Sequence, residues 1–379
     1  MAVSSGVVWT GSAPAVMAAD GAREMPAGAL ERAAPSHAAM VDRAIRDVVL
    51  PRVGAFRARA DRLADVTAAW CDGPGASAAT APPADPPAEV VDAFRAAATE
   101  WAGIEYLRFG PLRDANRVPR ISFWPDPRGV VRRQVAKALA DRDADLVADG
   151  GIARQSAAVQ GLPAIEVLLD APADVTSDAN GYRCRLVAAM AANVAKLAGE
   201  VDVGWRSADG WAHRMRTAGP GNAAYHTDAE AAAELLKALL AGLQIVGEQE
   251  ITPWIDAAQK RRAWAGLPFE RSGLSQAYVA SAVASLRELH QALRLDAVAR
   301  KLGADGQSWI VGWLDNAYGT LTRDSAALRL PAVLAAEEAA DIDHLRRVKF
   351  YSNGLRQIIG RQIAPGANLL IGFNDLDGD

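Results

Sequence analysis

The apolar residues between Pro35 and Cys71 recur every three or four positions, which is the spacing of one face of an α-helix. Alanine, the strongest helix former, is abundant along the whole chain, and runs of β-branched residues typical of strands are scarce. Pro51 lies inside the first periodic stretch and predicts a kink there. These features predict an all-α protein.

Composition narrows the function classes. The chain has 379 residues, a hydrophobic content of 50%, a charged content of 23% and a formal net charge of −4. This net charge is not positive, whereas a nucleic-acid-binding protein usually carries an excess of Lys and Arg on its binding surface. No run of about 18 apolar residues is present, so the sequence predicts no transmembrane helix.

The length and the periodicity predict more than one helical core. A Gly- and Pro-containing break at residues 217–222 divides the chain, and Thr227 to Glu230 form a capping box after it. We expect two tandem antiparallel four-helix bundles, over residues 35–217 and 218–379. The expected helices cover residues 35–71, 88–109, 128–140, a stretch from 151 that restarts at Pro163, 177–211, 227–246, 275–295, 306–323 and 331–363.

Residues 1–34 have two interpretations. Residues 6–19 are weakly apolar and end in a small-residue pattern that signal peptidase accepts, but the basic region that precedes such a segment is missing. The stretch is therefore either an incomplete signal peptide or a disordered tail. The two cysteines, Cys71 and Cys184, form a disulfide if the protein is exported, or remain reduced in a core if it is not.

Trp101, Glu105 and Arg108 are spaced four and three residues apart, so they share one face of the helix expected over residues 88–109. Glu105 and Arg108 form either an exposed ion pair or a buried charged pair that lines a cavity between helices. The stretch after this helix, residues 110–129, is a long loop rich in proline and arginine. Its aromatic anchor Trp124 and its charged residues Arg120 and Asp126 are typical of a functional loop.

Glu166 is the carboxylate in the apolar stretch SAAVQGLPAIEVLL, residues 156–169. Pro163 fits the first position of a helical segment, which would place Glu166 in its first turn, where the helix dipole favours an acid by about 0.3–1 kcal/mol. Glu166 is then either a simple N-terminal charge or an acidic anchor inside a bundle. Since an unpartnered buried carboxylate costs several kcal/mol, we expect it to have partners elsewhere in the chain.

Five segments together resemble the imelysin-like proteins, which form peptidase family M75. They are spread in order over nearly the whole chain from about residue 37: TEWAGIEYLRFGPL (99–112), RISFWPDPRG (120–129), SAAVQGLPAIEVLL (156–169), YRCRLVAAMAANVAKLA (182–198) and GFNDLDGD (372–379). The resemblance implies an exported bacterial protein of two four-helix bundles, a site between them, and a link to iron acquisition.

The motif of this family is G-x-H-x-x-E, and Gly161 and Glu166 match its ends, while Pro163 stands at the histidine position. Proline supplies no metal ligand, and a zinc peptidase normally needs three protein ligands, so we predict no catalytic residue. Glu166 is the best candidate for contact with a metal, and iron is the metal that the resemblance suggests. The resemblance also favours a Cys71–Cys184 disulfide between the first and fifth helices.

We therefore predict an exported, periplasmic binding protein that takes a small charged or iron-containing ligand and acts with iron-uptake proteins of the cell envelope. The alternatives are an M75-type metallopeptidase and a helical scaffold that binds a partner but no small ligand. The expected ligand-binding residues are Glu166, Glu105, Arg108, Trp101, Arg120, Trp124, Asp126, Gly161, Gln160 and Ser156.

Overall fold

The computed structural model describes residues 34–72, 85–170, 181–260, 266–329 and 340–370. Within these ranges every regular element is helical, which confirms the all-α prediction. The expectations for residues 1–33 and for the carboxyl-terminal segment 371–379 concern parts of the chain outside the described residues. Among the described helices, none has both the length and the apolar character needed to cross a membrane.

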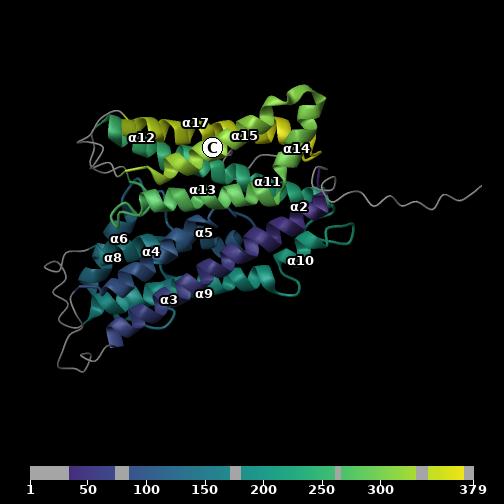
Figure 1. Ribbon diagram of the computed structural model, residues 1–379. Helices are drawn as coiled ribbons and strands as arrows, with labels where there is room; N and C mark the ends of the chain where they lie inside the picture. The colour runs from purple at the N-terminus through teal and green to yellow at the C-terminus, as the bar shows by residue number, and fades with distance from the viewer. Residues whose placement is uncertain (1–33, 73–84, 171–180, 261–265, 330–339, 371–379) are drawn as a thin grey trace, which may run out of the picture.

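The helices are arranged in two layers (Figure 1). One layer holds helices of the first half: α3 (Leu50–Asp72), α4 (Ala88–Ala102), α6 (Val130–Asp141), α8 (Leu162–Leu169) and α9 (Tyr182–Arg206). The other holds helices of the second half: α11 (Asp228–Gln244), α12 (Thr252–Gln259), α13 (Ser275–Ala292), α14 (Leu295–Leu302), α15 (Trp309–Ala326) and α17 (Ala340–Ile358). The short helices α5 (Arg117–Ile121) and α10 (Trp211–Arg216) belong to the first half.

The first helical rod connects the two layers. Its opening segment α2 (His37–Ala44) packs against α11 of the second half, whereas its continuation α3 packs against α4 and α9. His37 hydrogen-bonds to the carbonyl of Ala367 at 2.7 Å, and Arg43 donates to the carbonyl of Ala292 at 3.0 Å. The two expected bundles thus share this rod, and the boundary at residue 217 stays a prediction.

Three of the widened π-helical turns each end two residues before a proline. They are Ile45–Val49 before Pro51, Ile245–Ile251 before Pro253, and Ile359–Ile363 before Pro365. Proline cannot donate to the carbonyl four residues back and its ring crowds that carbonyl, so a wider turn relieves the conflict. At Pro51 this local widening takes the place of a break in the helix. The turn Ile245–Ile251 also places Glu250 in the interior.

Two helix boundaries differ from the predicted ones in ways that matter for the site. The helix expected over residues 88–109 ends at Ala102, because the amide of Gly103 closes a tighter turn onto Glu100. Ser285 of α13 holds this turn by donating to the carbonyl of Gly103 at 2.7 Å. The helix containing Glu166 begins at Leu162, so Glu166 lies beyond its first turn and the predicted dipole effect is wrong.

The core runs continuously through both layers. Its largest fully buried side chains include Trp101, Trp205 and Trp254. Cys71 at the end of α3 and Cys184 at the start of α9 are joined by a disulfide between residues 113 positions apart. The Thr227 half of the predicted capping box is confirmed, since its hydroxyl accepts from the amide of Glu230 at 3.2 Å, while the Glu230 side chain accepts from the amide of His226 at 2.7 Å.

Candidate functional site

A pocket of about 370 Å³ lies where the loop of residues 122–129, the helices α6 and α8, and residues 266–271 meet. The loop and these two helices belong to the first half of the chain, and residues 266–271 belong to the second. Glu166, Pro163, Trp124 and Asp126 line it. This pocket therefore brings together three of the predicted site residues and adds a wall from the second half.

Glu166 is 6% exposed, and it is held by a residue from the other half of the chain. Its Oε1 atom accepts hydrogen bonds from the Ser272 amide at 2.9 Å and from the Ser272 hydroxyl at 2.8 Å. Burial raises the pKa of the Glu166 carboxyl, while the bonds from Ser272 and the charge of Arg271 act in the opposite direction. Among the described residues, Oε2 has no hydrogen-bond donor, which leaves it available to a ligand.

In the loop of residues 122–129, Trp124 forms part of the pocket wall and Asp126 caps a helix. Trp124 donates its indole N–H to the carbonyl of Gly266 at 3.1 Å, which joins the loop to the second half across the pocket. Asp126 accepts from the amides of Val130 at 2.8 Å and Val131 at 2.9 Å, which satisfies two free amides at the start of α6. Asp126 therefore stabilises the pocket wall, and its oxygens are largely used.

Four other predicted residues support the wall from outside the pocket. A Cβ on Gly161 would lie 2.2 Å from the carbonyl oxygen of Ile121, so only glycine allows this close approach. Arg120 donates to the Gln160 side chain at 2.8 Å, and the backbone carbonyl of Gln160 accepts from Asn193 at 3.0 Å. Ser156 is exposed and caps a short 3₁₀ turn. These residues connect Glu166's helix to the loop and do not line the pocket.

Glu105 and Arg108 form a second, separate cluster with two residues of the second half, Glu250 and Tyr278. We call these four residues the interior carboxyl cluster. Glu105 is 4% exposed and Glu250 is fully buried. Burial raises the pKa of both carboxyls, and the charge of Arg108 opposes this at each. Glu105 is therefore buried, and the half-buried Arg108 acts on it through its charge and not through a direct ion pair.

The two carboxyls of this cluster approach each other closely enough to share a proton. The negative charge of Glu105 adds to burial and raises the pKa of Glu250 well above its usual range, so the two carboxyls together retain a proton. Without that proton, both oxygens of Glu250 and Oε1 of Glu105 lack a hydrogen-bond partner among the described residues, as does Nε of Arg108. Unpaired groups of this kind are costly, so the cluster depends on its net charge and its proton.

Phe269 lies between the two sites. It lines the pocket of Glu166, and its ring contacts the Tyr278 ring at a centroid distance of 5.3 Å and the Phe94 ring at 5.8 Å. Glu105, Arg108 and the fully buried Trp101 do not line the pocket. Contrary to the expectation, Glu105 and Arg108 therefore do not line the pocket of Glu166, because the amide of Glu105 bonds to the carbonyl of Trp101 and keeps Glu105 on the buried side of that residue.

Comparison with known proteins gives the family. The family model for imelysin, peptidase M75, matches residues 53–303. The chain belongs to the imelysin family. A search of curated proteins finds no match for it.

Two solved structures share the fold of this imelysin-family chain. An imelysin-like protein from Psychrobacter arcticum 273-4 is 19% identical with a TM-score of 0.67, and the alignment covers 90% of this chain and 99% of that one. A protein from Parabacteroides distasonis ATCC 8503, named as an iron-regulated protein A precursor, is 13% identical with a TM-score of 0.68, and 89% and 96% of the chains are covered. At these identities the likeness shows the fold.

The partners of Glu166 and Glu105 that the sequence did not reveal come from the second half, whereas further arginines of the pocket lie in the first half, at the start of α6. Arg271 and Ser272 lie within a turn of residues 268–273, and Glu250 and Tyr278 lie on helical elements with no local motif. Their role depends on contacts between residues more than 100 positions apart, such as Glu166 with Ser272. The residues just before Glu250 are themselves polar, so no local pattern indicated a buried charge there.

Proposed function

We propose that this imelysin-family protein binds a small anionic ligand, with an iron chelate as the favoured class, in the pocket of Glu166, and that it does so without catalysing a reaction. The observation that carries the proposal is that one nearly buried carboxylate, Glu166, lines the same pocket as four arginines, and that this pocket is built from both halves of the chain.

The charge of the pocket favours an anion. Its lining includes the arginines Arg128, Arg132, Arg133 and Arg271, against the acids Glu166 and Asp126. Arginine binds planar carboxylate and phosphate groups through paired N–H donors. The aromatic side chains of Phe123, Trp124 and Phe269 supply an apolar wall for the body of a small organic molecule.

The donor set fits a chelate better than a bare ferric ion. Hard oxygen donors suit iron, but the pocket offers the oxygens of Glu166 while those of Asp126 cap α6. Within the described residues no group of three or more His, Cys, Asp or Glu is arranged to hold a metal ion. Iron would therefore have to arrive with its own ligands, whose negative charge meets the arginines while Glu166 Oε2 contacts the metal or a donor group.

Family and covalent structure support a role in iron uptake outside the cytoplasm. One fold neighbour is named as an iron-regulated protein A precursor, which suggests iron-linked regulation and export for that protein. The disulfide between Cys71 and Cys184 is the kind of bond that persists in an oxidising compartment. We therefore place the protein in the bacterial periplasm, acting with envelope iron-uptake proteins.

Peptidase chemistry is not part of this proposal. Pro163 lies in the pocket wall at the position of the family's motif histidine and offers no ligand or base. A metal-activated water would need further protein ligands close to Glu166. Purified protein that retains zinc and cleaves peptides in a chelator-sensitive manner would contradict the proposal.

Isothermal titration with ferric citrate, haem and free ferric iron tests it. We expect ferric citrate to bind, and Glu166→Gln to weaken that binding at least about tenfold, equivalent to about 1.4 kcal/mol. Glu89→Gln, which changes an exposed glutamate on α4, is the matched control and should bind like the wild type. Binding of none of the three probes, or equal binding by Glu166→Gln and wild type, would contradict the proposal and favour the scaffold alternative.

A further inference from the structure

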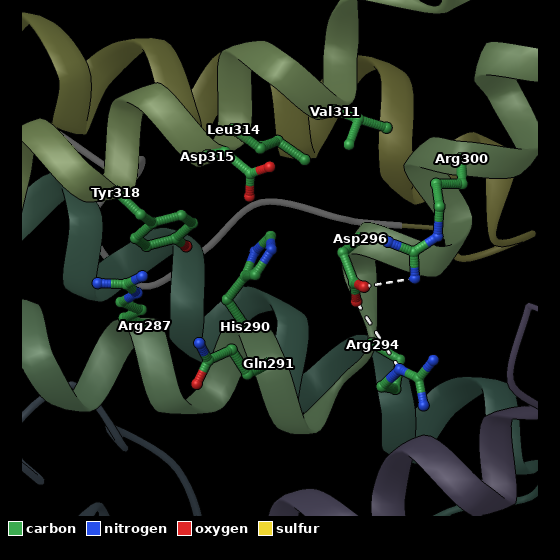
Figure 2. A pocket seen from close by; sticks show the side chains of 10 residues that line it. All are labelled: Arg287, His290, Gln291, Arg294, Asp296, Arg300, Val311, Leu314, Asp315 and Tyr318. Carbon is green, nitrogen blue, oxygen red and sulfur yellow. Dashed lines mark hydrogen bonds and ion pairs between the residues drawn. The ribbon is translucent and has the colours of Figure 1, made fainter. Parts of the chain in front are cut away.

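A second pocket, of about 470 Å³, lies entirely within the second half of the chain, between α13, α14 and α15 (Figure 2). It shares no lining residue with the pocket of Glu166. His290 and Arg287 come from α13, Asp296 and Arg300 from α14, and Asp315 and Tyr318 from α15. No residue of the proposed iron-chelate site contributes to it, so it needs an explanation of its own.

His290 and Tyr318 are two buried polar side chains in the wall of this pocket. Their rings are in contact, with a centroid distance of 4.6 Å, and they are 5% and 4% exposed. Among the described residues, neither Nδ1 of His290 nor the hydroxyl of Tyr318 has a hydrogen-bond partner. A buried polar group without a partner costs about 1–3 kcal/mol, which a group brought by a ligand would recover.

Both groups are uncharged at neutral pH. Burial lowers the pKa of His290 to about 4, and burial raises the pKa of Tyr318 well above its usual range. His290 therefore presents a neutral imidazole and Tyr318 a protonated hydroxyl. Together they offer hydrogen bonds to an uncharged polar group.

Arginines surround this neutral pair. Arg294 and Arg300 share Asp296, at 3.8 Å and 2.6 Å, on one side of the pocket (Figure 2). Arg287 lies on the other side, where its charge acts on both His290 and Tyr318, and it donates to the Thr322 hydroxyl at 3.3 Å. With the three arginines against Asp296 and Asp315, the lining has a formal charge of +1.

We propose that this pocket is a second binding site, for a small organic anion. The acid group of the ligand, a carboxylate or a phosphate, meets Arg287, and an adjacent hydroxyl or carbonyl reaches Tyr318 and His290. The ligand needs both an acid group and a polar group. The arginines would attract any anion, whereas the unpaired atoms of His290 and Tyr318 favour an anion that also forms hydrogen bonds.

Matched probes separate these two requirements. Glycerol 3-phosphate and malate each carry an acid group next to a hydroxyl, inorganic phosphate and acetate carry the acid group alone, and glycerol carries the hydroxyls alone. Each probe is titrated by calorimetry at constant ionic strength, and the imidazole NMR signals are followed. With five histidines in the chain, the His290 signal can be assigned by comparison with His290→Gln.

We expect glycerol 3-phosphate or malate to bind at least fivefold more tightly than its acid-only counterpart and to shift the His290 signal. Tyr318→Phe removes only an unpartnered hydroxyl and should fold normally while binding at least fivefold more weakly. Arg287→Gln should weaken binding similarly, and Arg59→Gln, a change of an exposed arginine on α3, should not. The proposal is overturned if neither glycerol 3-phosphate nor malate shifts the His290 signal, or if Tyr318→Phe and Arg287→Gln bind these two compounds like the wild type.

Discussion

The pocket of Glu166 and the interior carboxyl cluster both contain buried glutamates, but the glutamates have different surroundings. In both, burial raises the pKa of a glutamate that lies between the two halves of the chain. Glu166 has hydrogen bonds from Ser272 at one oxygen and a pocket at its side, whereas Glu105 and Glu250 face each other and Arg108 in a closed interior. The comparison shows that a buried acid becomes a candidate ligand when its neighbours leave one oxygen free at a pocket.

The largest expected effect concerns the interior carboxyl cluster. Glu105→Ala removes a buried carboxyl on which the charge of Arg108 acts and leaves its space in the interior unfilled, so we expect the free energy of unfolding to fall by about 3–5 kcal/mol. Denaturant unfolding measures this. Glu89→Ala on α4, the helix that precedes Glu105, changes an exposed glutamate and should cost no more than about 1 kcal/mol. A loss of similar size in both variants would show that Glu105 has no special structural role.

The next effect concerns the support of the pocket. Gly161→Ala would force a Cβ to within 2.2 Å of the Ile121 carbonyl, so the loop must shift, and we expect a loss of about 1–3 kcal/mol. Gly199→Ala on α9 is the control, since nothing lies within 4 Å of its Cβ position and alanine favours the helix by about 0.5–1 kcal/mol. The midpoint temperature of thermal unfolding should therefore fall in Gly161→Ala and rise in Gly199→Ala.

A third effect is the pH dependence of stability. The pKa of Glu250 is raised in the folded protein, so the stability that its proton provides is fully present below about pH 4.3, its unfolded value, and is lost as pH rises toward the folded pKa. Glu250→Gln keeps a neutral side chain at every pH. The difference in unfolding free energy, wild type minus Glu250→Gln, should fall by up to about 1.4 kcal/mol per pH unit above this point. A constant difference between pH 4 and 8 would show that the pKa of Glu250 is not raised in the folded protein.

The smallest effect on stability is expected at Glu166. Glu166→Gln retains a side-chain oxygen that can accept from Ser272, so the free energy of unfolding should change by about 1 kcal/mol or less. A loss of 3 kcal/mol or more, on the order expected for a broken buried ion pair, would make Glu166 a structural residue like Glu105. Equilibrium unfolding in urea, at the pH used for the titrations, gives the comparison.

Much of the fold could be predicted because it depends on local periodicity. The apolar residues that recur every three or four positions up to Trp70 are buried, and the cap at Thr227 is present. The end of α4 at Ala102 could not be predicted, since the helical spacing continues to Arg108 and the turn is held by Ser285, which lies 182 positions away from Gly103. Of the candidate site, only residues of the first half of the chain were predicted. Glu166, Trp124 and Asp126 meet at the pocket, but their partners Ser272 and Gly266 could not be inferred from any local pattern.

The sequence by itself determined that this protein is helical and that Glu166 needs partners, because helical periodicity and the cost of burying a charge are properties of the residues themselves. Only the tertiary structure decided which glutamate has a free oxygen at a pocket and which shares a proton in the interior. That difference arises because donors and charges from the second half, Ser272 in one place and Glu250 in the other, approach the first half only when the two layers pack.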